Sequence, residues 1–242
     1  MSMKPSSSSL KRIGSALFAI GSLLALALTA LLVWADVEAV QYGFPRMGKG
    51  PMRGLSCPQF MNGTEDTGFS LTLTNTLDRV LRPGVQVFIS DPGISRWRTF
   101  TQRFDMEPGE SQTETWDVSA GDIVLGTFVF AKVHTYASYP QSDMEGVCGI
   151  FVVGIPWLRG AVLFWLWFVL SLGFLITGFW LSDIRKVEGE PSSENAFVRR
   201  ILALLAVTGL IAGSIGLWLV GIIVLAVTAL ALLTAFAIRQ SI

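Results

Sequence analysis

Charged residues are scarce in this chain, and three long stretches have none. Of 242 residues only 15 % are charged, whereas about a quarter is usual in soluble domains. The stretches without Asp, Glu, Lys or Arg are residues 13–35, 160–182 and 201–238. Each exceeds the roughly 20 apolar residues that cross a bilayer. The sequence therefore predicts a membrane protein that contacts the lipid bilayer directly.

The sequence contains no motif typical of several common function classes. The 18 basic and 18 acidic residues cancel and form no basic tail, so no nucleic-acid partner is predicted. Common hydrolase and phosphate-binding motifs are missing. A single histidine, His134, falls short of the three or four ligands usual for zinc. A sulfur-rich group, Met47, Met52, Cys57 and Met61, would suit Cu(I) but also suits apolar packing. We expect no catalytic residue, no cofactor and no metal site.

The last uncharged stretch is too long for one span. As a single helix, residues 201–238 would extend about 57 Å, against a hydrocarbon core of about 30 Å. The glycines and serine of residues 213–216 are the natural break. The sequence thus predicts four transmembrane helices: 13–35, 157–182, and a hairpin over 199–238.

Lysine and arginine near the spans predict the orientation. Eight lie in the N-terminus (1–12), the loop 183–198 with the adjoining Arg199 and Arg200, and the C-terminus (239–242), against four beside the other ends of the spans. These three segments are therefore expected in the cytoplasm. The remaining segment, 36–156, is then extracytoplasmic. Residues 13–35 could instead be a cleaved signal peptide, although their length favours an uncleaved signal anchor. Either alternative sends segment 36–156 across the cell membrane.

Only two cysteines are present, Cys57 and Cys148, and both lie in the segment expected outside. An oxidising compartment permits a disulfide between them. Such a bond would close a loop of about 90 residues and stabilise the domain by about 4–5 kcal/mol in the chain-entropy model. The alternative is two separate buried thiols.

Alternating apolar residues and turn residues predict an all-β domain in this segment. The expected strands are 68–76, 85–89, 97–106, 111–118, 123–136 (interrupted by Gly126) and 149–155. Six or seven strands of this length fit two packed sheets.

Part of this segment resembles a bacterial immunoglobulin-like or fibronectin type III-like module of the CARDB type. The resemblance covers about residues 67–153 and rests on strand 70–75, the turn 108–110 followed by 113–116, and residues 126–130. It implies an immunoglobulin-like β-sandwich inserted between transmembrane helices. It implies no ligand, because such modules serve many functions.

The predicted function is non-enzymatic display of this domain for protein or surface-polymer contact, or an accessory role in a membrane complex. A component of a transport assembly is the alternative. A membrane enzyme using Asp105, Glu107 and Glu110 is less favoured, because these residues flank a predicted turn. Gly209 and Gly213 form a Gly-x-x-x-Gly pattern that favours helix packing within the chain or in a homo-oligomer, or else belongs to the turn.

Overall fold

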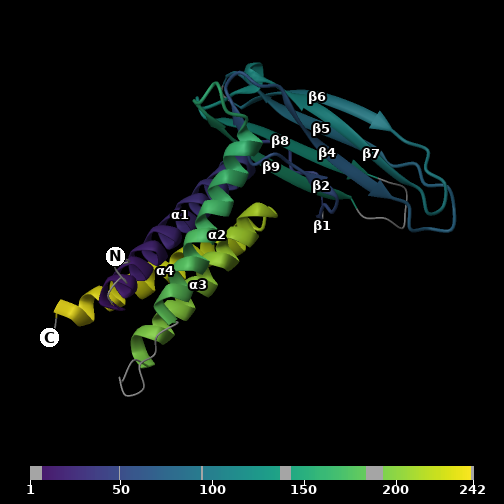
Figure 1. Cartoon of the computed structure of the whole chain (residues 1–242). Coiled ribbons are helices and arrows are strands. Elements are labelled where there is room, and N and C mark those ends of the chain that lie inside the picture. The colour runs from purple at the N-terminus through teal and green to yellow at the C-terminus, as the bar shows by residue number, and fades with distance from the viewer. Residues whose placement is uncertain (1–6, 49, 94, 137–142, 184–192, 241–242) are drawn as a thin grey trace, which may run out of the picture. The chain divides into compact units, whose positions relative to one another are not determined.

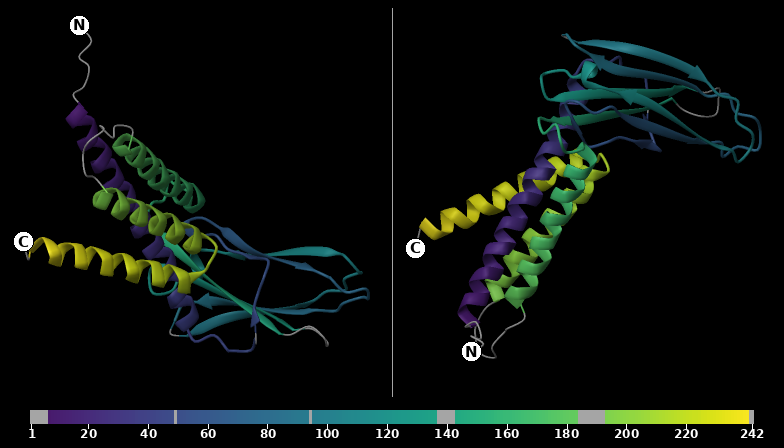
Figure 2. Two further views of the ribbon diagram at one scale, coloured as in Figure 1. Left: turned by 90° about the horizontal axis from the view of Figure 1, so that it is seen from below. Right: turned by 45° about the horizontal axis from the view of Figure 1, so that its top comes forward.

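The computed structural model describes residues 7–48, 50–93, 95–136, 143–183 and 193–240. The chain forms two compact units (Figures 1 and 2). A helical unit combines Met1–Val33 with Trp165–Ile242, and a β unit comprises Trp34–Phe164. Of the predicted cytoplasmic segments, residues 1–6, 184–192 and 241–242 lie outside the described residues.

Four helices are present: α1 (Ser7–Gln41), α2 (Gly160–Asp183), α3 (Ser193–Ser214) and α4 (Trp218–Gln240). The break between α3 and α4 falls at the predicted glycine turn. Gly216 adopts a φ of 73°, and Leu217 N donates to Ala212 O at 2.8 Å. This bond closes the end of α3 in the manner of a Schellman motif, which requires a left-handed residue that glycine supplies at little cost.

The prediction of four transmembrane helices is wrong. Among the described residues only two helical segments, Arg12–Gln41 and Gly160–Leu181, are long and apolar enough to cross a membrane. In α3 the uncharged part begins at Ile201 and the helix ends at Ser214, which gives about 21 Å at 1.5 Å per residue. The apolar part of α4, Trp218–Leu233, is also short of a full span.

Small residues allow the helices of the helical unit to pack closely. A side chain at Gly21 of α1 would meet the backbone of Leu175 in α2. Gly209 and Gly213 of α3 lie within the helix and face Thr29 and Leu32 of α1. Both glycines therefore lie at a helix contact.

The β unit contains two sheets. One has the order β1–β9–β8–β5–β6, with β3 also paired to β9, and the other has the order β2–β4–β7. The strands are β1 (Gly50–Pro51), β2 (Leu55–Ser56), β3 (Phe60–Asn62), β4 (Thr67–Thr74), β5 (Gly84–Asp91), β6 (Arg96–Arg103), β7 (Ser111–Val118), β8 (Phe128–Tyr136) and β9 (Met144–Val153).

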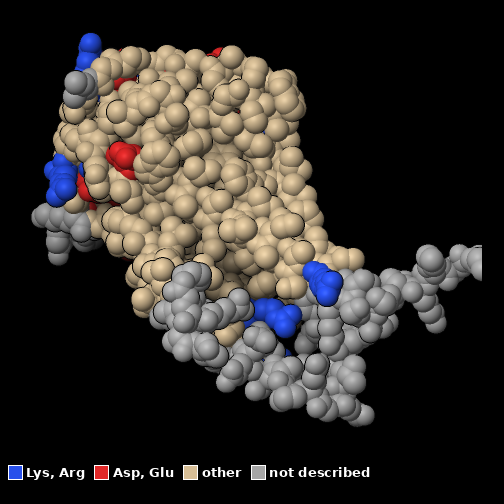
Figure 3. Space-filling view, turned by 90° about the vertical axis from the view of Figure 1, so that its left-hand side faces the viewer, with Lys and Arg blue, Asp and Glu red and all other residues tan. Residues whose placement is uncertain are grey.

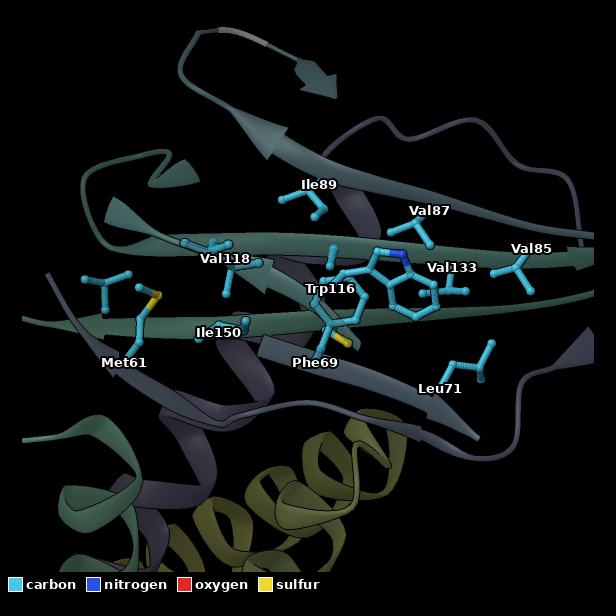
Figure 4. Close-up of a cluster of buried hydrophobic side chains, with 14 residues drawn as sticks. Met61, Phe69, Leu71, Val85, Val87, Ile89, Trp116, Val118, Val133 and Ile150 are labelled. Atoms are coloured by element: carbon cyan, nitrogen blue, oxygen red, sulfur yellow. The ribbon is translucent and has the colours of Figure 1, made fainter. Parts of the chain in front are cut away.

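The main core of the β unit lies between the two sheets. Phe69 and Leu71 of β4 and Trp116 of β7 pack against alternate residues of β5, β8 and β9 (Figure 4). The Phe69 and Trp116 rings stack with centroids 5.5 Å apart. These residues lie on the apolar faces that the period-two pattern predicts, so burial fixes the register of the long strands.

The prediction of an all-β immunoglobulin-like sandwich is also wrong. The larger sheet is mixed, because β1 and β3 pair with β9 in parallel. Helical residues also belong to this unit, since α1 continues past Trp34 to Gln41 and α2 begins at Gly160. The short parallel strands lie in a Gly, Pro and Met segment without alternation, which is why the strand pattern missed them.

A second cluster covers the outer face of the larger sheet. Ala35 and Ala39 of α1, together with Phe44, pack against Phe128 and Phe130 of β8. At Gly149 of β9 an added Cβ would overlap the carbonyl of Ala35. The last two turns of α1 therefore form part of the core of the β unit.

Candidate functional site

Cys57 and Cys148 form a disulfide with their Cα atoms 6.1 Å apart and 91 positions apart in the chain. Cys148 lies on β9 in the core between the sheets, whereas Cys57 lies between β2 and β3. The bond ties the segment that carries β1–β3 to the last strand of the unit. It belongs to the framework of the unit.

An ion pair between a buried lysine and a partly exposed glutamate lies on the outer face of the larger sheet. Lys132 Nζ of β8 is 2.8 Å from Glu145 Oε2 of β9, and the Lys132 side chain is 4 % exposed. The same carboxylate oxygen accepts hydrogen bonds from Gly48 N (2.9 Å) and Met47 N (3.2 Å). Burial alone would raise the pKa of Glu145, but the bonds from Lys132, Gly48 and Met47 together lower it. The pair holds the segment after α1 against the sheet.

His134 lies two residues from Lys132 on the same face and opposite Glu145 in the register. Its side chain is buried, and its ring stacks on Tyr136 with centroids 5.7 Å apart. Neither ring nitrogen has a hydrogen-bond partner among the described residues. No group of three His, Cys, Asp or Glu side chains suited to a metal occurs in the described part of the chain.

A cleft of about 450 Å³ opens between the sheets near the end of β8 and the start of β9. Leu81, Pro83 and Met106 give it a buried apolar floor, and Arg53 and Thr74 lie at its exposed margin. Asn75 holds the neighbouring loops. Its side chain donates to the carbonyls of Arg79, Met106 and Glu107 and accepts from Leu77 N.

The most accessible strand of the β unit is β6, at the margin of the larger sheet (Figure 1). It pairs with β5 on one side, and no described strand pairs with its other edge. All its residues except Trp97 are exposed. The strand carries three arginines and no acidic residue. Arg98 contacts Asp122 at 2.8 Å, and Arg96 lies 3.7 Å from Asp91.

Three members of the sulfur-rich group found in the sequence share the core between the sheets: Met61 is buried in it, and Met52 and Cys57 pack against it. Cys57 is in the disulfide, and Met47 packs against the outer-face cluster instead. Two of the three carboxylates at the predicted turn have structural partners. Asp105 is 2.8 Å from Arg82, and Glu110 accepts a hydrogen bond from Glu107 N.

Sequence reasoning missed the Lys132–Glu145 pair and the hub at Asn75. Lys132 had a detectable signal, since it is a charged residue in the middle of an otherwise buried strand. Its partner could not be identified, because the pairing depends on the β8–β9 register. Asn75 carries no signal in sequence alone, because its hydrogen bonds reach loops about 30 residues away.

Hydroxyl groups within the helices bond to their own helix. Thr29 donates to Ala25 O, Ser171 to Trp167 O and Thr228 to Val224 O, at 2.8–2.9 Å. The Trp167 indole N–H of α2 links this helix to α1, because it donates to Leu24 O at 3.0 Å.

No protein-family model and no curated protein matches this chain. Among solved structures, a β-glucosidase from Listeria innocua gives a TM-score of 0.31 at 19 % identity, over 41 % of this chain and 15 % of that one. A β-glucosidase from Erythrobacter marinus gives 0.27 at 22 % identity, over 39 % and 14 %. A cycloisomaltooligosaccharide glucanotransferase from Paenibacillus sp. gives 0.32 at 14 % identity, over 44 % and 14 %. The chain thus spans about a seventh of these enzymes, and likenesses this low identify no family for it.

Proposed function

We propose that this protein is a non-enzymatic membrane protein that holds its β unit outside the cytoplasm for contact with a protein or a surface polymer. The observation that carries the proposal is the surface of the two apolar helices that flank the β unit. On α1 and α2, Leu23, Val169, Ile176 and Trp180 are each more than 60 % exposed. Large apolar side chains in such density favour lipid over water as their surroundings.

The scarcity of charged side chains on the surface is consistent with a membrane protein. In the view of Figure 3, much of the surface carries neither basic nor acidic side chains. α2 has no acidic residue in its first turn and no basic residue in its last, and it is apolar on all sides. A helix that is hydrophobic all round suits a membrane span or the centre of a large protein.

The disulfide and the distribution of positive charge support the orientation. Disulfides persist in oxidising compartments, and Cys57–Cys148 lies in the β unit. Arg12 precedes the apolar part of α1, and Arg199 and Arg200 precede that of α3. Positive residues at these flanks favour the cytoplasmic side.

Two measurements test the proposal, one on isolated membranes and one on intact cells. Alkaline carbonate should leave the full chain in the membrane pellet, whereas detergent should release it. A cysteine introduced at the exposed Thr113 of β7, and modified from outside with a membrane-impermeant maleimide photo-cross-linker, should then join the β unit to a neighbouring component at the cell surface. Release by carbonate alone, or cross-linking only after lysis, would contradict the proposal.

A further inference from the structure

The free edge of β6 has defined hydrogen-bonding positions. Phe104 N donates to Pro83 O at 3.1 Å, and the β5–β6 register is antiparallel throughout. Backbone groups alternate in direction along an antiparallel strand. Arg98, Phe100 and Gln102 therefore direct their N–H and C=O groups toward β5, and the four residues Trp97, Thr99, Thr101 and Arg103 direct theirs outward.

We infer that this edge binds β6 of a second copy of the chain in antiparallel orientation, with the two-fold axis at Phe100. In this register Trp97 lies opposite Arg103 of the partner subunit, and Thr99 lies opposite Thr101 of the partner subunit. Every outward-facing residue then pairs with another outward-facing residue. About eight backbone hydrogen bonds would join the two larger sheets into one.

Around Phe100 the strand reads Arg-Trp-Arg-Thr-Phe-Thr-Gln-Arg, and only the two threonines are symmetric about Phe100, but the facing side chains are compatible in this register. Phe100 is 40 % exposed and would pair with Phe100 of the partner subunit. Trp97 would meet a guanidinium, which favours a cation–π contact. Threonine pairs and aromatic pairs on adjacent strands each add stability.

Repulsion between arginines and the number of paired residues favour this register over registers that are shifted along the strand. Arg98 lies opposite Gln102 of the partner subunit, so no two arginines face each other. A register centred on Thr99 would bring Arg98 diagonally beside Arg98 of the partner subunit. A register centred on Thr101 avoids that contact, but both shifted registers pair fewer of the outward-facing residues of the strand than the register centred on Phe100. Like charges on adjacent strands are destabilising, so the register centred on Phe100 is favoured.

The exposed edge of β7 is less available for pairing than the free edge of β6. The carbonyl of Asp117 already accepts a hydrogen bond from the Arg98 guanidinium at 3.1 Å. The edge of β7 is thus partly occupied by a side chain of the same molecule. β6 has no such contact on its outward-facing residues in the described part of the chain.

Pairing through β6 also sets a minimum distance between the two copies of Tyr42. Tyr42, directly after α1, donates to Arg96 O at the start of β6 at 2.7 Å. Antiparallel pairing places the corresponding tyrosines at opposite ends of the joined strands, roughly 23 Å apart or more for seven residues. This dimer contact would be one of the contacts made by the β unit, whose display outside the cytoplasm is proposed above. Its test uses purified protein and does not depend on the side of the membrane.

Cysteine cross-linking of the full chain in mild detergent tests the register. The native cysteines are paired, so Phe100→Cys introduces a single thiol. Two such residues in a non-hydrogen-bonded pair would have Cα atoms about 4.5 Å apart, within disulfide range. Gln102→Cys is the matched control on the same strand, because its two copies would be about 13 Å apart. Thr113→Cys serves as the control on β7.

Mild oxidation should convert Phe100→Cys to a covalent dimer at least about tenfold more than either control. Equal cross-linking of all three variants, or none with Phe100→Cys, would overturn the inference.

A proline variant tests the hydrogen bonds. Thr101→Pro removes an outward N–H while leaving the bonds to β5, and Thr115→Pro makes the matched change on β7. Mass photometry of the full chain should detect dimers of the unchanged protein and of Thr115→Pro. The dimer fraction of Thr101→Pro should fall about tenfold, as expected for two lost hydrogen bonds. Monomeric unchanged protein, or equal dimerisation of all three, would contradict the inference. Should Thr101→Pro fail to fold, the cross-linking result decides.

Discussion

Gly149 lies where the backbone of β9 meets α1, and its missing side chain determines how closely they approach. A Cβ at this position would overlap the carbonyl of Ala35 and lie 2.7 Å from Asp36 N. Gly149→Ala should therefore lower the free energy of unfolding by about 1–3 kcal/mol, the usual cost of overpacking. Urea unfolding in detergent, followed by tryptophan fluorescence, measures the change.

Gly154 is the matched control, because nothing lies within 4 Å of an added Cβ there. Gly154→Ala should leave the midpoint nearly unchanged. Equal destabilisation by both substitutions would mean that the contact between Gly149 and α1 is not what limits this position.

Lys132 is a second residue whose role depends on one partner. Removing one member of a fully buried ion pair costs about 3–5 kcal/mol. Glu145 is 27 % exposed, so Lys132→Met should cost somewhat less, about 2–4 kcal/mol. The double variant Lys132→Met, Glu145→Leu should recover part of this loss, because the backbone N–H groups of Met47 and Gly48 still lose their acceptor. Denaturant unfolding of the two single variants and the double variant measures the coupling, and additive losses would contradict it.

The lowered pKa of Glu145 predicts a pH dependence. A carboxylate with a folded-state pKa below its unfolded value contributes stability above the unfolded value, about 4.3 for glutamate. This contribution is lost as the pH falls through the lower folded-state value. Between about pH 5 and pH 3 the unchanged protein should thus lose more stability than Glu145→Gln. Parallel losses, measured by thermal unfolding across this range, would argue against the role of Glu145.

At the scale of elements, the long strands could be predicted from sequence and the short ones could not. β7 has the predicted bounds, Ser111–Val118, because alternation on a half-buried strand is a strong signal. β8 begins later than expected, since Leu125 (φ 51°) and Gly126 (φ 76°) turn the chain before Phe128. β1 and β3 depend on parallel pairing with β9, which leaves no local pattern.

The helices, too, could be predicted only in part from the sequence. Uncharged runs predicted where α1 and α2 lie, but apolarity alone overstated the membrane character of α3 and α4. The charged start of α3 and its end at Ser214 shorten the apolar part below a span. Candidate contacts were harder to predict than elements, because the free edge of β6 depends on the order of strands in the sheet.

The disulfide is an element-scale constraint, because it ties the segment containing β2 and β3 to β9. Closing a loop of this length should stabilise the β unit by about 4–5 kcal/mol. Reduction should lower the thermal midpoint of the unchanged protein, whereas Cys57→Ala, Cys148→Ala should unfold at that lower temperature with or without reductant. A midpoint insensitive to reduction would contradict a stabilising role.

At the scale of the whole molecule, the chain combines a helical unit with two span-length apolar helices and a disulfide-closed β unit. These features have a common explanation if the β unit is displayed outside the cytoplasm on membrane anchors. The self-association proposed through β6 would then display two copies of the β unit together. The central claim is therefore the side of the membrane on which the β unit lies.

Thiol labelling of intact cells with a membrane-impermeant reagent tests that claim most directly. The account predicts no labelling of Cys57 or Cys148 before reduction and labelling from outside after an impermeant reductant has been added. Free thiols that react without reduction, and only once the cells have been lysed, would place the β unit in the cytoplasm and contradict the account.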